Sequence, residues 1–260
     1  MMKKFWLFFV LFLGLFSGAL AKPLIIGMEL AYPPFEMSDK NGVPTGISVD
    51  LAKELGKSLG REIIIEDMSY GGLIPSLKTK KIDIILSSMS ITESRKKSVS
   101  FSVPYASSHL AILAGISSGI ESSEDLNSNK KKLAVKKGTS GHTVAQKYFP
   151  KAKLLVFEKE SACMLEVAQG KVDAFIYDPL TVYKFWEKNQ ETTTPLFERF
   201  EEKAQPWAIA YGKKDEKLGE QINEFLIEFK NTGGFDKLSE KYLKNEKEFF
   251  ESKNIPFFFD

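Results

Sequence analysis

One short apolar segment occurs twice in this chain, 90 residues apart. IDIILSS (82–88) matches VDAFIYD (172–178), and a lysine, Lys81 or Lys171, precedes each copy. Short apolar runs rich in β-branched residues are typical of strands buried in a sheet, and each run follows a predicted helix. The chain therefore uses one helix–strand unit twice, which predicts two similar α/β lobes.

The first copy ends in polar groups suited to a small ligand. Its last residues and those that follow are Ser87, Ser88, Met89 and Ser90. Thr92 suits a helix N-cap, so Arg95 lies one turn into the next helix. In open α/β sheets, small ligands bind beyond the carboxyl ends of strands. Hydroxyls suit an ammonium group and a guanidinium suits a carboxylate, so the stretch could bind both charges of an α-amino acid. The alternative is a solvated serine-rich turn followed by a surface arginine.

The second copy ends in Asp178, where the first ends in Ser88. A carboxylate at the end of a buried strand needs a partner, and a ligand ammonium group would supply one. This difference favours a binding site over a simple turn.

A glycine-flanked pair of hydroxyl residues follows the predicted strand that begins at Leu133. Gly138, Thr139 and Ser140 open a helical pattern, where free backbone N–H groups can bind an anion. The segment is too short for a Walker loop, so a carboxylate suits it better than a nucleotide phosphate. The alternative is a plain helix cap.

Three further side chains are expected at the same cleft. The strand 24–28 is followed by Glu29 and Tyr32, and the prolines at 33–34 form a stiff, non-helical loop. Tyr70 is expected in a loop, 68–72, that enters the same cleft. The alternatives are a solvated acid for Glu29 and a core aromatic for Tyr32.

The N-terminal residues predict export. Lys3 and Lys4 precede an apolar run at 5–16, and the stretch closes with Ala-Leu-Ala at 19–21. These features are typical of a secretory signal peptide, so we expect cleavage after Ala21 and a periplasmic protein. An uncleaved anchor is the alternative. No later stretch approaches the roughly 20 apolar residues of a membrane-spanning helix.

Composition argues against several classes of function. Without the leader, the chain has equal numbers of basic and acidic residues, which gives no case for nucleic-acid or anionic-membrane binding. It has one cysteine and two histidines. We therefore expect no intrachain disulfide, no His/Cys metal site and no cofactor.

The segment GLIPSLKTKKIDIILSSMSITESRKKSVSFS (72–102) is very similar to histidine and lysine/arginine/ornithine binders among the periplasmic solute-binding proteins of amino-acid ABC transporters. The resemblance extends over residues 24–243. It implies an α/β fold of two lobes, each a mostly parallel sheet flanked by helices. Two hinge crossings, near 106–108 and near Pro206, would join them. Residues 1–21 would be the signal peptide, 22–107 with 207–260 lobe 1, and 108–206 lobe 2.

The resemblance also implies roles for the cleft residues. Arg95 and the N–H groups of Ser90 and Ser140 would bind the α-carboxylate. Asp178, the Ser90 hydroxyl and the Ser88 carbonyl would bind the α-ammonium group, and two tyrosines would enclose the side chain. The expected ligand-binding residues are Glu29, Tyr32, Tyr70, Ser87, Ser88, Met89, Ser90, Arg95, Gly138, Thr139, Ser140 and Asp178.

The choice of ligand rests on Glu29. Binders of basic amino acids carry an aspartate at the matching position, facing the distal cation, which implies lysine or arginine as the ligand. Glu29 is one methylene longer, and Gly141 stands where histidine-type proteins carry a glutamine. Glutamine binders of the group also carry an acid at this position, so glutamine or another polar amino acid is the alternative.

The resemblance therefore implies a monomeric extracytoplasmic receptor, not an enzyme, that delivers an L-amino acid to an ABC permease. Small dehydratases similar to cyclohexadienyl dehydratase share the architecture and provide the second hypothesis. A dehydratase would need a free general base in the cleft, for which Glu29 is the candidate.

Overall fold

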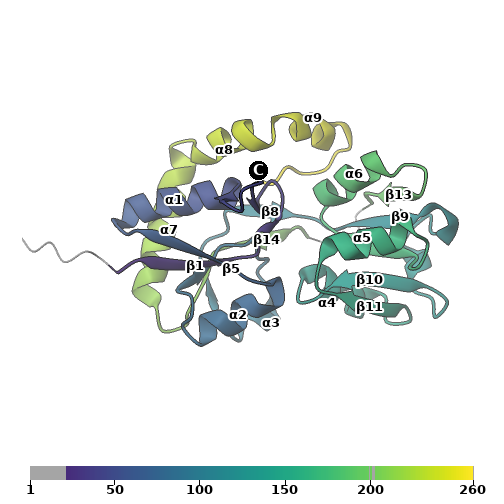
Figure 1. Cartoon of the computed structure of the whole chain (residues 1–260), viewed down its shortest axis with the longest axis horizontal. Coiled ribbons are helices and arrows are strands. Elements are labelled where there is room, and N and C mark those ends of the chain that lie inside the picture. Colours follow the sequence, from purple (N-terminus) through teal and green to yellow (C-terminus); the bar gives the residue numbers. More distant parts are fainter. Residues whose placement is uncertain (1–21, 199, 201–202, 260) are drawn as a thin grey trace, which may run out of the picture.

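The computed structural model describes residues 22–198, 200 and 203–259, which form two α/β lobes lying side by side (Figure 1). The helices of the first lobe are α1 (Ile47–Leu59), α2 (Tyr70–Lys78), α3 (Glu93–Lys96), α7 (Glu216–Asn231), α8 (Gly234–Tyr242) and α9 (Lys244–Ser252). Those of the second lobe are α4 (Ser140–Tyr148), α5 (Glu160–Ala168) and α6 (Pro179–Lys188), with short 3-10 helices at Ile116–Ser118 and Ser123–Leu126.

The first lobe is built on a five-stranded sheet of order β5-β1-β6-β15-β7. Its strands are β1 (Leu24–Met28), β5 (Ile63–Asp67), β6 (Ile84–Ile85), β7 (Ser100–Phe101) and β15 (Ala210–Tyr211). β5 and β6 are parallel to β1, whereas β15 is antiparallel to both of its neighbours. The sheet is therefore mostly parallel, as predicted, with β15 as its reversed strand.

The second lobe repeats this plan with the order β11-β10-β12-β9-β13. Its strands are β9 (Ala111–Gly115), β10 (Lys132–Lys136), β11 (Lys153–Phe157), β12 (Ala174–Tyr177) and β13 (Thr193–Leu196). β11 and β12 are parallel to β10, and β9 is the reversed strand. Both sheets thus present the carboxyl ends of parallel strands, the edge at which small ligands bind.

The predicted repeat is confirmed as a strand–helix–strand unit. β5 and β11 begin and end 90 residues apart, as do α2 and α5. In each unit, an aspartate just before the last strand accepts a hydrogen bond from the backbone N–H of another strand. Asp83 Oδ2 accepts a hydrogen bond from Ile25 N at 2.9 Å, and Asp173 Oδ2 accepts one from Lys132 N at 2.6 Å.

Two antiparallel strands connect the lobes. β8 (Ala106–Ser108) pairs with β14 (Gln205–Trp207), with Ser107 opposite Pro206. The expected hinge crossings fall on these strands, which lie between the lobes in Figure 1. A small sheet of β2 (Ala31–Tyr32), β3 (Glu36–Ser38) and β4 (Pro44–Thr45) follows β1 in the first lobe.

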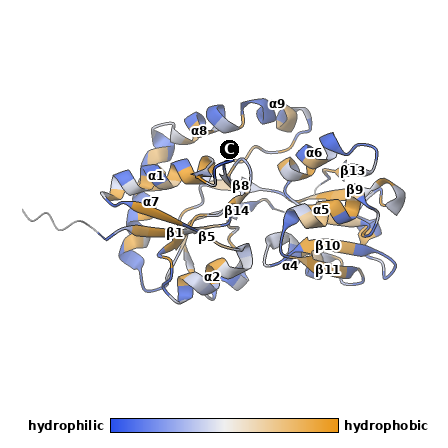
Figure 2. Cartoon of the chain, viewed as in Figure 1, coloured by the Kyte–Doolittle hydropathy of each residue, from blue (hydrophilic) through white to orange (hydrophobic). Residues whose placement is uncertain are grey.

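Both sheets are covered on both faces, and their central strands are largely apolar (Figure 2). In the first lobe, α1, α7 and α8 pack on one face and α2 packs on the other. In the second lobe, α4 covers one face, and α5 and α6 cover the other. This double coverage explains why the two repeated segments are continuous apolar runs without alternation.

The loop predicted at 68–72 is wrong in its second half, because Tyr70 begins α2. Gly71 and Gly72 have low helix propensity and favoured the loop. Helix packing outweighs that preference: Leu73 and Leu77 are buried against the sheet, and a Cβ on Gly27 would lie 3.1 Å from Leu73 Cδ2. The predicted strand at 82–86 is likewise shorter, since only Ile84 and Ile85 pair as β6.

The apolar C-terminal segment, 255–259, packs on the first lobe. Phe258 is 1% exposed; its ring centroid lies 4.8 Å from that of Phe35 and 5.4 Å from that of Trp207. Ser107 N on β8 donates to Phe258 O at 2.8 Å. The preceding helix, α9, contacts the second lobe, where Phe249 stacks on Tyr183. The C-terminal segment and α9 therefore pack against the outside of the hinge region.

The predicted signal peptide, 1–21, lies outside the described residues. Within the described ranges, none of the helices combines the length and the apolar character needed to cross a bilayer.

We predict that Phe258→Ala lowers the free energy of unfolding by about 3–5 kcal/mol, because it removes a buried ring from the cluster around Trp207. Urea denaturation followed by tryptophan fluorescence measures this loss. Val43→Ala is the matched control, since Val43 is 55% exposed and its truncation should change stability by less than about 0.5 kcal/mol. Equal denaturation midpoints for Phe258→Ala and the wild type would contradict the packing role.

Candidate functional site between the lobes

A cavity lies between the lobes, and residues from both sheets form its wall. The predicted residues that line it are Glu29, Tyr32, Tyr70, Ser87, Ser88, Ser90, Thr139, Ser140 and Asp178. Met89, Arg95 and Gly138 do not form part of the wall. Residues distant in the sequence thus meet at the carboxyl ends of β1, β6, β10 and β12.

Asp178 is a buried carboxylate at the start of α6. It is 5% exposed, and its Oδ1 accepts a hydrogen bond from Thr181 N at 3.0 Å, which caps the helix. Oδ2 and the Tyr32 hydroxyl are buried without a well-formed hydrogen bond to any described residue. Burial raises the pKa of Asp178, although hydrogen bonds from Thr181 and a weaker contact from the Tyr32 hydroxyl oppose the shift. A cation beside Oδ2 would relieve this desolvation.

Arg95 lies beside the cavity and bridges the lobes. Its Nη1 donates to the Ser90 carbonyl at 2.6 Å, and its Nη2 donates to the Gly138 carbonyl, across the cleft, at 2.9 Å. The guanidinium carbon lies 5.5 Å from the centroid of the Tyr70 ring. Because a guanidinium has five N–H donors, Arg95 retains donors for a carboxylate at this position.

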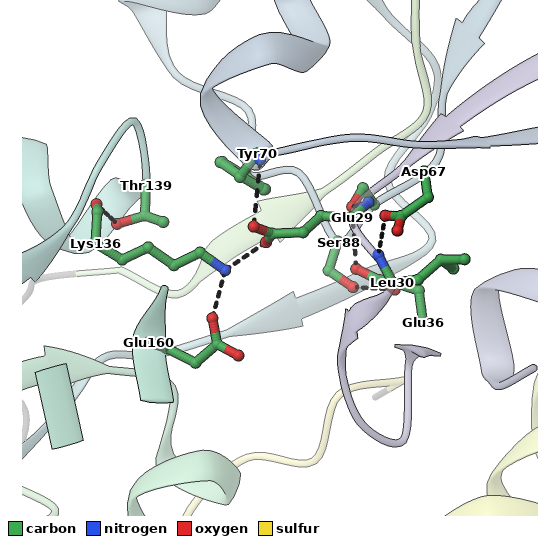
Figure 3. A network of polar contacts seen from close by, with 10 residues as sticks. Glu29, Leu30, Glu36, Asp67, Tyr70, Ser88, Lys136, Thr139 and Glu160 are labelled. Atoms are coloured by element: carbon green, nitrogen blue, oxygen red, sulfur yellow. Dashed lines mark hydrogen bonds and ion pairs between the residues drawn. The ribbon is translucent and has the colours of Figure 1, made fainter. Parts of the chain in front are cut away.

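A second bridge between the lobes is a buried ion-pair network (Figure 3). Lys136, the last residue of β10, is 0% exposed. Its Nζ donates to Glu29 Oε2 on the first lobe and to Glu160 Oε2, at the start of α5, at 2.6 Å. Tyr70 N donates to the other oxygen, Glu29 Oε1, at 3.3 Å. Both carboxylate oxygens of Glu29 are therefore engaged.

These contacts keep Lys136 charged. Burial lowers its pKa, but the carboxylates of Glu160 and Glu29 outweigh burial, and the pKa is raised above the ordinary value. For Glu29 burial is the larger effect and raises the pKa, although Lys136 opposes the shift. The network holds a persistent ammonium group at the interface.

Glu36 is a third buried acid in the cavity wall, after Asp178 and Glu29. It is 1% exposed, and it accepts hydrogen bonds from the hydroxyls of Ser48 at 2.6 Å, Ser88 at 3.1 Å and Ser87 at 3.3 Å. Burial raises the pKa of Glu36 to about 8, although these hydrogen bonds oppose the shift. Glu36 is therefore mostly protonated at neutral pH, and it holds two predicted site serines in place.

Aromatic side chains form the rest of the wall. Tyr32 and Tyr70 line the cavity as predicted, together with Tyr177 and Trp207. The Tyr32 ring centroid lies 5.8 Å from that of Tyr177 and 6.0 Å from that of Trp207, both edge to face. The wall can thus enclose an apolar or planar group while the polar residues bind its charges.

The start of α4 serves as a helix cap as well as part of the wall. Thr139 Oγ1 accepts from His142 N at 3.3 Å and donates to Lys136 O at 2.8 Å. A Cβ on Gly141 would lie 2.8 Å from Ile176 O. Glycine therefore lets α4 approach β12 closely, and a glutamine at position 141, as in the histidine-type proteins, would not fit this packing.

Sequence reasoning missed part of the wall and the network behind it. The additional lining residues are Glu36, Ser108, His109, Leu110, Gly141, Tyr177, Gln205 and Trp207. Tyr177 immediately precedes Asp178 in the second repeat, and Gln205 and Trp207 flank the predicted hinge crossing at Pro206. These three residues could therefore have been predicted from the sequence. The sequence did not indicate that Lys136 and Glu160 are buried, because a pair of lysines and an acid at the start of a helix are usually solvated.

Across the described part of the chain, histidine, cysteine, aspartate and glutamate residues form no group suited to holding a metal ion. Cys163 is buried on α5, and burial raises the pKa of its thiol to about 12. A buried thiol of this kind is a poor nucleophile.

Residues 24–245 match the family model for bacterial extracellular solute-binding proteins, family 3. The chain is 30% identical over 228 residues to the arginine-binding extracellular protein ArtP of Bacillus subtilis, covering 87% of this chain and 88% of that protein. It is 28% identical to the L-cystine-binding protein TcyJ of Escherichia coli, covering 85% and 82%. The similarity extends over both lobes.

The fold also resembles solved structures. The crystal structure of the ancestral amino acid-binding protein AncCDT-1, a precursor of cyclohexadienyl dehydratase, matches with a TM-score of 0.76 and 36% identity, covering 85% of this chain and 95% of that one. These proteins bind different amino acids on one scaffold, so the scaffold alone does not fix the ligand.

We predict that Glu36→Gln flattens the pH dependence of stability. The folded-state pKa of Glu36 is raised to about 8 from 4.5, so between these values the folded state holds a proton that the unfolded state has lost. Stability conferred at low pH is therefore lost as pH rises from about 5 to 8, with a slope of about 1.4 kcal/mol per pH unit from this group. Glu36→Gln removes this contribution.

Urea denaturation at pH 5, 6, 7 and 8 tests the slope. Glu93→Gln is the matched control, because the Glu93 side chain is 86% exposed and its change should leave the slope as in the wild type. Parallel stability curves for Glu36→Gln and the wild type would show that Glu36 is ionised in the folded protein.

Proposed function

Because the chain belongs to the bacterial extracellular solute-binding proteins of family 3, we propose that it binds one free L-amino acid in the cavity between its lobes. The observation that carries this proposal is Asp178, a residue of the cavity wall whose buried Oδ2 has no well-formed hydrogen bond to any described residue. An α-ammonium group would satisfy that oxygen. Arg95, whose Nη1 donates to the carbonyl of the lining residue Ser90, would receive the α-carboxylate.

Binding would couple to closure of the lobes. Ser88, Ser90 and Arg95 belong to the first lobe, whereas Ser140 and Asp178 belong to the second. A ligand in the open cleft can contact one set, and it contacts both sets only when the lobes close. The ligand therefore stabilises the closed form by its differential affinity, and the closed form is the one that a membrane permease would recognise.

The resemblance and the family support an extracytoplasmic receptor that works with an ABC permease. Export through a signal peptide cleaved after Ala21, a periplasmic location and a monomeric state remain parts of this proposal. Mass determination of the secreted protein and light scattering would test them.

The side chain of the ligand is a separate question. Lysine or arginine was predicted because Glu29 was expected to face a distal cation. Arginine binding by ArtP supports this choice by analogy. Against it, Glu29 already pairs with Lys136. Glutamine, or another uncharged amino acid, is the second candidate, and the Glu29–Lys136 pair is the observation that favours it.

A dehydratase on the same fold is the alternative class. It would need a general base free to accept a proton from the substrate. Glu29, the predicted candidate, has Lys136 and Tyr70 N on its two carboxylate oxygens. An assay for turnover of prephenate and arogenate separates the two functions; turnover dependent on Glu29 would favour the enzyme.

A screen of the twenty L-amino acids tests the proposed function directly. Co-purified ligand is first removed by unfolding and refolding, and the melting temperature is then measured with each amino acid in excess. A ligand that binds only the folded state raises the melting temperature. The absence of a shift with all twenty, in a protein shown by circular dichroism to be refolded, would overturn the proposal.

We predict that Asp178→Asn and Arg95→Ala each weaken binding of the best amino acid by about 2–5 kcal/mol, because each leaves one ligand charge buried without its partner. Asparagine also caps helices, so Asp178→Asn should preserve the start of α6. Isothermal titration calorimetry measures both losses. Lys96→Ala is the control, since Lys96 neighbours Arg95 but its side chain is 52% exposed. Affinities within threefold of the wild type would refute these roles.

A further inference from the structure

Lys136 is a cation that the proposed binding mechanism does not use. Its side chain is 0% exposed, and its Nζ lies between Glu29 and Glu160 (Figure 3). The same nitrogen lies 5.8 Å from the ring centroids of both Tyr70 and Tyr177. Two carboxylates and two aromatic rings are the groups that a protein uses to bind an ammonium group. In this protein, the ammonium group of Lys136 makes these contacts itself.

The position of this network relative to the cavity determines its effect. Glu29 lines the cavity, whereas Lys136 and Glu160 lie outside the lining. A ligand therefore meets Glu29 with Lys136 already bound to it. Since the second Glu29 oxygen accepts from Tyr70 N, no carboxylate oxygen of Glu29 is left without a partner for a ligand cation.

A ligand with a basic side chain has two ways to use Glu29, and both are costly. It could displace Lys136, which would leave a buried ammonium group with Glu160 as its one remaining carboxylate partner. It could instead place a second cation beside Lys136, in a buried region where like charges repel strongly. Both penalties would lower affinity for lysine and arginine relative to uncharged amino acids.

The other acids in the wall do not offset these penalties. Asp178 is assigned to the α-ammonium group. Glu36 accepts from three serine hydroxyls, and burial raises its pKa to about 8, so it is mostly protonated at pH 7. What remains around the ligand side chain is aromatic and hydroxyl-bearing, from Tyr32, Tyr70, Tyr177 and Trp207.

We propose that Lys136 is a specificity-determining residue: it neutralises Glu29 and adapts the cavity to an L-amino acid whose side chain carries no charge. This assignment rests on the proposed function and names the ligand class for the same cavity. Lys136 acts through Glu29 and does not itself contact the ligand.

The test compares the wild type with the double variant Lys136→Met/Glu160→Gln. The double change removes one charge of each sign, so the formal charge of the network is kept and Glu29 alone faces the cavity. Affinities for L-lysine, L-arginine, L-glutamine and L-leucine are measured by isothermal titration calorimetry at pH 7 on stripped protein. Circular dichroism establishes that each protein is folded.

In the wild type, we expect an uncharged amino acid to bind at least about tenfold more tightly than lysine or arginine. In the double variant, we expect the ratio of lysine or arginine affinity to that of the uncharged ligands to rise by at least about tenfold, because Glu29 is released for the ligand. Lys137→Met is the matched control. Lys137 is the next residue, pairs with Glu158 on the surface and has a side chain 57% exposed, so the wild-type ranking should persist.

A wild type that prefers lysine or arginine would overturn this assignment while leaving the proposed function intact. So would an unchanged affinity ratio in a folded double variant. If the double variant does not fold, the wild-type ranking decides the question alone. Failure of every amino acid to bind the folded wild type would instead overturn the proposed function, and this assignment with it.

Discussion

A charged group that leaves water must meet a partner of opposite charge, and this constraint governs the interface between the two lobes. On the first lobe, Glu29 and Arg95 lie at the edge of the cleft; on the second, Lys136 and Asp178 do. All four side chains are buried in the structure. Lys136 pairs with Glu29, and Arg95 donates to the Gly138 carbonyl. Asp178 Oδ2 has no well-formed hydrogen bond to a described residue, and a ligand ammonium group could be its partner.

The fold could be predicted from the sequence because its determinants are local and repeated. Strands buried on both faces are continuous apolar runs, and the match between 82–88 and 172–178 revealed the second copy of the strand–helix–strand unit. The predictions of local structure that were wrong concern positions where tertiary packing outweighs local preference. Tyr70 begins a helix despite Gly71 and Gly72, because burial of Leu73 and Leu77 against the sheet outweighs the low propensity of glycine for helix.

The site could be predicted only where a residue's position in the chain implied its environment. Asp178 and the serines Ser87, Ser88 and Ser90 follow buried strands, so their position at the cleft could be predicted from the sequence. Lys136 also ends a strand, but its partners are 24 and 107 residues away in sequence, and its neighbour Lys137 is solvated. Glu36 likewise depends on Ser87 and Ser88, 51 and 52 residues away. No local pattern distinguishes such residues from surface charges.

The Lys136–Glu29 pair and Asp178 differ in what they can contribute to closure of the lobes. The contact between Lys136 and Glu29 joins two groups of the protein itself, and the Coulombic gain of a buried ion pair is largely offset by the loss of hydration. We therefore infer that this pair contributes more to the alignment of the lobes than to stability. Burial raises the pKa of Asp178, and the protein supplies it with hydrogen bonds but with no cationic partner. Under the proposed function, a zwitterionic ligand would place its ammonium group beside Asp178. The ligand would thereby supply free energy that favours the closed form of the lobes.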